Sequence, residues 1–124
     1  MVLNCTESLV TLATQNFEVV VNFYQQFLEK TPINQIPNIY AEFQISGLRL
    51  GIFKPKGSSQ EEFANSTQSS MSLCLEVKDL EAAIAHLTTI GYPPSGQIAT
   101  ASHGREIYAY DPEGNRIILH QAKN

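Results

Sequence analysis

The sequence contains no tryptophan and only two cysteines, Cys5 and Cys74, among its 124 residues. It has no Cys-x-x-Cys pair, which argues against a zinc cluster or a redox dithiol and favours two free thiols in a reducing cytoplasm. No apolar run approaches the roughly 18–20 residues of a membrane span. Residues 1–7 lack the basic and apolar regions of a signal peptide. We therefore expect a cytoplasmic protein without a membrane partner.

Positive charge is also scarce. The chain has 8 lysines and arginines against 12 aspartates and glutamates, which leaves no basic surface for nucleic acid. Apolar residues make up 43% of the chain and charged residues 16%, a composition that excludes a disordered protein. The length fits one domain that covers residues 1–124 and builds its core without disulfides.

The first half of the chain, about residues 6–54, is predicted to form a strand, a helix and three more strands. Apolar residues recur at helical spacing over residues 17–29, after Asn16, which suits a helix N-cap, and Thr31-Pro32 is expected to end the helix. Alternating or β-branched residues predict the strands, at residues 8–14, 33–36, 39–45 and 48–54.

The second half, about residues 71–122, repeats this order after a polar linker at residues 55–70. A strand is predicted at 71–77, and Asp79 is expected to cap a helix that reaches about Thr89 and closes at Gly91. With an offset of 63 residues, Leu12 aligns with Leu75. The remaining strands are predicted at residues 96–100, 106–110 and 116–121.

Three motifs now carry a family resemblance. They are Asn22-Phe23-Tyr24 in the first helix, residues 76–83 at the start of the second half, and the hairpin around Asp111-Pro112-Glu113-Gly114-Asn115. In this order the chain resembles the glyoxalase, bleomycin-resistance and extradiol dioxygenase superfamily, the vicinal oxygen chelate proteins. The resemblance implies an α+β fold in which two βαβββ units form curled mixed sheets around a hollow, with the helices outside. The Asp-Pro-Glu-Gly-Asn turn itself is structural, because proline and glycine supply its backbone angles.

Members of that family that use a divalent metal hold it with His or Gln and Glu side chains on four strand positions. Carried over to this sequence, three of these positions fall on Leu9, Ser72 and Ile118, and the fourth falls near Gly51. Leucine, serine and isoleucine do not replace imidazole and carboxylate ligands. We therefore expect a degenerate metal site, no metal ligand and no cofactor, and a glyoxalase I reaction is disfavoured.

Strand alternation predicts which side chains line the hollow. The residues predicted to bind a ligand combine apolar and polar side chains, as ligand sites usually do. They are Thr11, Arg49, Phe53, Ser72, Cys74, Glu76, His103, Tyr108, Tyr110, Arg116, Ile118 and His120.

Several of these residues have alternative interpretations. Glu76 is either a general base whose pKa is raised by burial or a carboxylate at the open rim of the sheet. His120 either pairs with Glu76 or is exposed near the C-terminus. His103 either contacts a ligand or lies in a solvated loop. The two tyrosines, Tyr108 and Tyr110, either stack on a flat ligand or cap the core.

Three functions remain open on this basis. The first is a protein that binds a small organic molecule in the hollow, as bleomycin-resistance proteins do. The second is a lyase- or dioxygenase-type enzyme of the same superfamily, with or without metal, that uses Glu76, His120 or Arg49. The third is an interaction domain with a filled hollow. The first helix carries more apolar surface than one sheet face needs, which predicts a homodimer.

Overall fold

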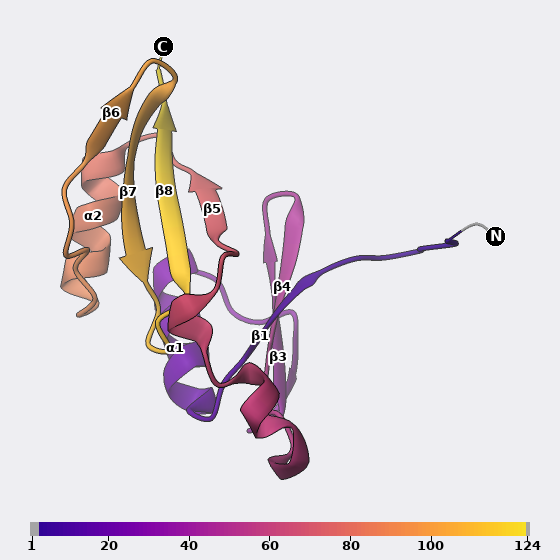
Figure 1. Ribbon diagram of the computed structural model, residues 1–124. Helices are drawn as coiled ribbons and strands as arrows, with labels where there is room; N and C mark the ends of the chain where they lie inside the picture. The colour runs from indigo at the N-terminus through magenta and orange to yellow at the C-terminus, as the bar shows by residue number, and fades with distance from the viewer. Residues whose placement is uncertain (1–2, 124) are drawn as a thin grey trace. The chain divides into compact units, whose positions relative to one another are not determined.

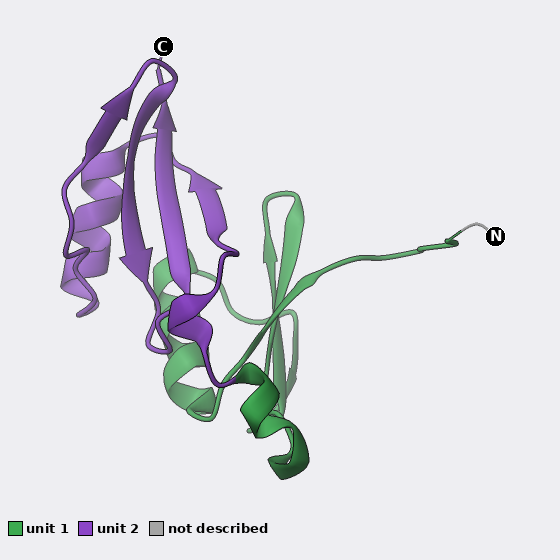
Figure 2. Ribbon diagram, in the orientation of Figure 1, with its two compact units in different colours: residues 1–63 green, residues 64–124 purple. Residues whose placement is uncertain are grey.

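The computed structural model describes residues 3–123 (Figure 1). The chain divides into two compact units, the first ending at Phe63 and the second beginning at Ala64 (Figure 2). This boundary falls inside the polar segment predicted as a linker. There the structure has two 3-10 helices, η1 (Gly57–Phe63) and η2 (Ser66–Gln68), where the sequence pattern suggested only irregular chain.

The first unit forms a four-stranded mixed sheet and one long helix. Its strands lie in the order β1-β4-β3-β2, with β1 parallel to β4 and the other pairs antiparallel. The elements are β1 (Val10–Ala13), α1 (Phe17–Leu28), β2 (Asn34–Ile36), β3 (Tyr40–Ile45) and β4 (Leu48–Phe53).

The second unit repeats this topology. Its strands lie in the order β5-β8-β7-β6, and β5 is again parallel to the last strand of the unit. Two βαβββ units, each with a mixed sheet and one helix, confirm the predicted α+β fold class. The elements are β5 (Leu73–Glu76), α2 (Leu80–Thr89), β6 (Ala99–Ala101), β7 (Gly104–Tyr110) and β8 (Arg116–Ala122).

Strand alternation sorts each sheet into a buried face and an open face. In the first unit Leu50 and Ile52 of β4 are fully buried, and α1 contacts this strand. In the second unit Ile117 and Leu119 of β8 are fully buried, and α2 contacts this strand. Because neighbouring residues in a strand point to opposite sides, the residues between them lie on what we call the open face of each unit.

The helix ends follow the sequence signals only in part. Asp79 caps α2 by accepting a hydrogen bond from Ala82 N at 3.0 Å, and Gly91 follows the helix with φ of 97°, both as predicted. Asn16 stands at the N-cap of α1 without a side-chain capping bond, and α1 ends at Glu29 in a left-handed conformation (φ 55°) before Pro32 is reached. No helix within residues 3–123 combines the length and apolarity needed to cross a bilayer.

The apolar surface of α1 is not in excess. Phe17, Val20, Phe23 and Tyr24 are each at most 3% exposed within the single chain. The sequence argument for a homodimer assumed that part of this surface would need a second subunit to cover it, and that assumption is wrong. It fails because most apolar residues of α1 form one broad face of the helix, and that face is already buried.

Asp111 holds the hairpin between β7 and β8. Its buried carboxylate accepts hydrogen bonds from the backbone N–H groups of Glu113 and Asn115, both at 2.9 Å, and from the Asn115 side chain at 2.8 Å. Gly114 follows with φ of 84°, a conformation that suits glycine. The motif therefore acts as a turn, as predicted.

Candidate functional site

The open face of the second unit carries most of the predicted site residues, in three rows across β5, β8 and β7. The strand register places Cys74, Ile118 and Tyr108 in the middle row. On one side of that row lie Glu76, His120 and Glu106, and on the other side lie Arg116 and Tyr110. Residues directly opposite each other in such pairs share a face of the sheet, so the structure brings these side chains together as the sequence suggested.

Arg116 is oriented by neutral oxygens. Its Nε donates to Ser72 Oγ at 2.7 Å and its Nη2 to the carbonyl of Ser69 at 3.0 Å. Among the described residues it forms no ion pair with a carboxylate. The guanidinium charge is therefore held in place but not neutralised, next to Tyr110 on the opposite strand.

Tyr108 and Tyr110 alternate with the buried residues Ile107 and Ala109 along β7. Their exposed fractions are 47% and 42%. These values contradict the interpretation that the tyrosines cap the core, because such residues would be covered, and stacking on a ligand stays a prediction. Both rings are accessible from the open face, where aromatic surface is available to a ligand.

Glu76, His120 and His103 form a chain of hydrogen bonds at the far end of this face. His120 Nδ1 lies 2.6 Å from Glu76 Oε1, and His120 Nε2 lies 3.1 Å from His103 Nδ1. The pairing of Glu76 with His120 is thus observed. His120 is held inside β8 with a side chain only 16% exposed, so the alternative that it is exposed near the C-terminus is wrong.

Burial does not raise the pKa of Glu76. The hydrogen bond from His120, together with one from Ala122 N to Oε2 at 2.6 Å, holds the pKa of this carboxyl below its usual range. The side chain is 58% exposed, as expected for a carboxylate at the rim of the sheet. The alternative of a buried base with a raised pKa is therefore wrong, because two donors stabilise the charged form.

Cys74 stands beside these groups in the neutral form. Partial burial raises the pKa of its thiol, and the carboxylates of Glu106 and Glu76 raise that pKa further. A nucleophilic cysteine needs the opposite environment, one that lowers its pKa. Cys74 therefore contributes to the lining of the face and not to thiolate chemistry.

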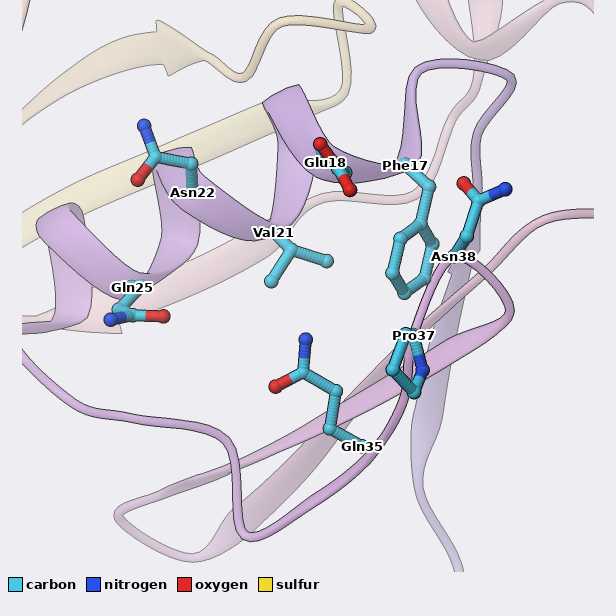
Figure 3. A pocket seen from close by; sticks show the side chains of 8 residues that line it. All are labelled: Phe17, Glu18, Val21, Asn22, Gln25, Gln35, Pro37 and Asn38. Atoms are coloured by element: carbon cyan, nitrogen blue, oxygen red, sulfur yellow. The ribbon is translucent and has the colours of Figure 1, made fainter.

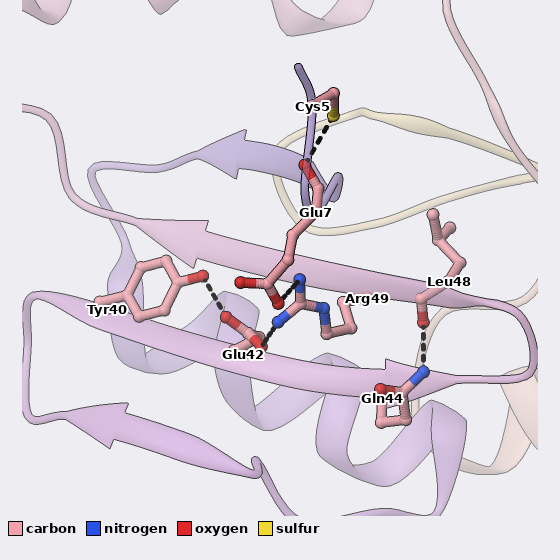
Figure 4. A network of polar contacts seen from close by, with 7 residues as sticks. All are labelled: Cys5, Glu7, Tyr40, Glu42, Gln44, Leu48 and Arg49. Atoms are coloured by element: carbon pink, nitrogen blue, oxygen red, sulfur yellow. Dashed lines mark hydrogen bonds and ion pairs between the residues drawn. The ribbon is translucent and has the colours of Figure 1, made fainter.

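The open face of the first unit is dominated by an ion-pair network (Figure 4). Arg49 donates to Glu7 Oε1 at 2.8 Å and to Glu42 Oε2 at 3.2 Å. Tyr40 donates from its hydroxyl to Glu42 Oε1 at 2.7 Å. The sequence analysis offered Arg49 for anion binding or acid–base work, but two carboxylates already neutralise its charge. Arg49 is therefore a structural cation in this network.

Tyr40 covers the centre of the same face. Burial and the neighbouring Glu42 carboxylate raise the pKa of this phenol to about 12, so it stays protonated and donates its proton to Glu42. A Cβ placed on Gly51 would lie 2.7 Å from the Tyr40 hydroxyl. The glycine thus makes room for the ring. The other predicted residues of this unit, Thr11 and Phe53, lie on the open face in adjacent rows, with Thr11 exposed and Phe53 edge-to-face with Phe63.

The sequence analysis missed Tyr40, Glu42 and Glu106 on these faces. The sequence signal for them is the alternation of polar and apolar residues in residues 40–45 and 106–110. Each of the three is next to an apolar, buried residue in its strand, so these three side chains point to the other face of the sheet. None of the three residues stands at a position of the family motif, and none lies in the first or last strand of its unit.

At the four positions where the family resemblance implied metal ligands, the structure describes other side chains. Leu9 is 38% exposed, Ile118 is half-buried, and Ser72 accepts the hydrogen bond of Arg116. Gly51 lies under Tyr40. Within residues 3–123 no group of three or more histidine, cysteine, aspartate or glutamate side chains is arranged to hold a metal ion.

One hollow, of about 180 Å³, lies elsewhere in the first unit (Figure 3). Phe17, Val21 and Gln25 of α1 face Gln35 and Pro37 across it. It contains none of the predicted site residues, and it is smaller than the roughly 300–1,000 Å³ of most small-molecule sites. We therefore place the candidate site on the open face of the second unit.

Similar structures have the same fold at low sequence identity. A fosfomycin resistance protein, FosX, from Listeria monocytogenes is 16% identical, with 98% of this chain and 96% of that chain covered and a TM-score of 0.76. A bleomycin resistance determinant encoded on the transposon Tn5 is 18% identical, covering 97% and 100%, with a TM-score of 0.67. A glyoxalase-related enzyme from Fulvimarina pelagi is 19% identical, covering 94% and 88%, with a TM-score of 0.75. These similarities concern the fold alone.

No curated protein sequence matches this chain. The sequence profile described as Glyoxalase/Bleomycin resistance protein/Dioxygenase superfamily, however, matches residues 8–119, which include both βαβββ units and the Asp111 turn. The resemblance inferred from the motifs is thereby confirmed over most of the chain. The protein belongs to the glyoxalase, bleomycin resistance protein and dioxygenase superfamily.

Proposed function

We propose that the protein binds a small, flat organic anion on the open face of its second unit. The observation that carries this proposal is the state of Arg116, whose guanidinium is oriented by Ser72 and Ser69 but meets no carboxylate among the described residues. A planar guanidinium held in this way is suited to a carboxylate, sulfonate or phosphate.

The tyrosines supply the second half of the recognition. Tyr110 lies directly opposite Arg116 in the register, and Tyr108 lies opposite Ile118. A ligand whose acidic group contacts Arg116 can place its ring on Tyr110, Tyr108 and Ile118, which together offer apolar surface without a charged group. Burial of exposed aromatic surface by a ring contributes free energy in addition to the ionic contact.

We also propose that this binding needs no divalent metal. The position corresponding to one family ligand is Ser72, and its hydroxyl is hydrogen-bonded by the cationic Arg116. A metal ion there would be repelled by the guanidinium and would meet no carboxylate or imidazole from Ile118 of the same unit. The two free thiols, Cys5 and Cys74, are both exposed, which supports a reducing, cytoplasmic location.

Calorimetric titration tests the ligand class directly. We expect 2-naphthoate to bind to the full chain, and the variant Arg116→Gln to weaken its affinity about tenfold or more, since a charge-assisted hydrogen bond is lost. The uncharged analogue 2-naphthylmethanol should bind weakly and equally to both proteins. The matched control is Arg105→Gln, because Arg105 pairs with Glu81 and not with a group of the open face.

The same titration repeated in excess EDTA tests the metal-free part of the proposal. If binding needs no divalent metal, the affinity for 2-naphthoate should be unchanged by EDTA. Two results would contradict the proposed function: equal affinity of the wild type and Arg116→Gln for the anion, or loss of binding when metal is removed.

We propose in addition a homodimer that forms through a different surface from the one the sequence suggested. β2 is the last strand of the first sheet, and three isoleucines at this strand, Ile33, Ile36 and Ile39, are between 52% and 57% exposed. An edge strand with exposed β-branched residues offers both backbone groups and apolar area to a second copy of the chain.

Sedimentation equilibrium at micromolar concentration measures this association. We expect the wild type to sediment at twice its chain mass of 13.8 kDa and the variant Ile36→Glu to sediment as a monomer. Val19→Glu serves as the control, since Val19 is similarly exposed, at 51%, but lies on α1. A monomeric wild type would refute the dimer.

A further inference from the structure

The three hydrogen-bonded side chains at the end of the open face have a fixed order. Glu76 is the last residue of β5, His120 lies beside it in β8, and His103 belongs to the turn that joins β6 to β7. The two imidazole rings lie 5.2 Å apart between centroids with 30° between their planes. The contacts therefore run in one line, from a carboxylate through one imidazole to a second imidazole.

The chemistry of the carboxylate decides where the protons lie. Glu76 accepts from Ala122 N through Oε2, and its lowered pKa keeps it ionised at neutral pH, so Oε1 acts only as an acceptor. His120 Nδ1 must then carry the proton of the 2.6 Å contact, which leaves a lone pair on His120 Nε2. His103 Nδ1 in turn donates to that lone pair, and the lone pair of His103 Nε2 remains for another molecule.

We propose that this relay makes His103 Nε2 the general base of a catalytic site on the second unit. A bound substrate gives a proton from an O–H or an acidic C–H group to His103 Nε2 and keeps the electron pair of that bond. His103 Nδ1–H can then shift its proton to His120 Nε2, so that the positive charge spreads over two rings. His103 is the residue that touches the substrate, and His120 and Glu76 are positioning residues.

The relay has carboxylate and thiol neighbours on the strands beside it. Glu106 of β7 stands opposite His120, and Glu76 lies on its other side, so two carboxylates flank this ring. Cys74 of β5 is neutral because its pKa is raised, and Lys123, whose backbone N–H donates to the carbonyl of His103, follows β8. The carboxylates of Glu76 and Glu106 therefore lie on either side of the ring that would receive the shifted proton.

The relay and Arg116 share one strand. Arg116 begins β8 and His120 lies four positions further along it, which corresponds to about 13 Å. A ligand anchored at Arg116 can therefore extend across Ile118 toward His103. The relay does not depend on the proposed anion site, because none of its three members contacts Arg116.

Hydrolysis of p-nitrophenyl acetate by the full-length chain tests the base. His103 Nε2 takes one proton from water as the water oxygen adds to the acyl carbon, and p-nitrophenolate leaves with the electrons of its C–O bond. The acetic acid that remains loses the second water proton to the solvent and becomes acetate. We expect His103→Gln to lower the rate at neutral pH at least about tenfold, and Glu76→Gln and His120→Gln to lower it severalfold. His86→Gln, which removes the imidazole of α2, should leave the rate unchanged.

Long-range proton–nitrogen NMR spectra of the histidine rings supply a measurement that a purely structural role would not change. In the wild type, His120 and His103 should both carry their proton on Nδ1, and Glu76→Ala should release this preference in both rings while the fold is retained. The proposal would be overturned if the wild type hydrolysed the ester at the same rate as His103→Gln. It would also be overturned if the spectra showed the proton of His120 on Nε2 in the wild type. Because the ester is uncharged, failure here is distinct from failure of Arg116 to bind anions.

Discussion

Replacing Gly104 by alanine is expected to cause the largest loss of stability of any substitution considered. Gly104 is buried at the start of β7 with φ of 147°, a region that residues with a side chain rarely adopt. A Cβ there would collide with the backbone carbonyl of Gln121 and lie 3.1 Å from Ala122 Cα. Because both are backbone atoms of β8, a rotamer change cannot relieve the collision.

We expect Gly104→Ala to lower the free energy of unfolding by about 3–5 kcal/mol, as the sum of backbone strain and overpacking. Urea denaturation followed by circular dichroism measures this loss. Gly96→Ala is the matched control, since a Cβ at Gly96 meets no atom within 4 Å and its φ is not positive. A loss below about 1 kcal/mol in Gly104→Ala would show that β8 can move away, contrary to this packing argument.

The second large effect is expected at Arg49. The Glu42 side chain is only 8% exposed and that of Arg49 is 27% exposed, so this ion pair is largely removed from water. The variant Arg49→Met keeps the apolar stem but leaves the buried Glu42 carboxylate without a cation, although the hydrogen bond from the Tyr40 hydroxyl remains. We expect a loss of about 2–4 kcal/mol, because an uncompensated buried charge is costly.

Two further variants separate this cost from the general effect of losing a surface charge. The double variant Glu42→Leu with Arg49→Met removes both charges, and it should be more stable than Arg49→Met alone. Glu81→Gln is the control for an exposed pair. Its partner Arg105 holds the pKa of Glu81 at about 2, yet Glu81 is 62% exposed, and solvent weakens such pairs. If the double variant is as unstable as Arg49→Met, the uncompensated charge of Glu42 is not the cause of the loss.

The positions of strands and helices were accessible from sequence because they depend on local patterns. The alternation in residues 48–53 placed Arg49 on the open face, and the cap at Asp79 fixed the start of α2 to the residue. The end of α1 was less accessible. The helix stops at Glu29 in a left-handed conformation that glutamate rarely adopts, and the sequence signal at Pro32 lies beyond it.

The site was accessible only in outline. Family positions and alternation together selected His120, Glu76, Tyr108 and Arg116, and the structure places all four on one open face. Which arginine retains an unneutralised charge was not accessible, because Arg49 and Arg116 occupy similar alternating positions. The difference arises from Glu42, which reaches Arg49 from a neighbouring strand, whereas Arg116 meets only Ser72 and Ser69.

The sequence by itself therefore determined the two βαβββ units, the family, the Asp111 turn and the side of each strand that stays open. These features depend on residue type and on the side-chain periods of strands and helices, about two and 3.6 residues, and both can be seen in the sequence. Only the tertiary structure decided the charge state of Glu76, the line from Glu76 through His120 to His103, and the burial of α1. Each of these depends on atoms from strands distant in sequence, and a pKa or a hydrogen bond is set by such neighbours rather than by the residue that carries it.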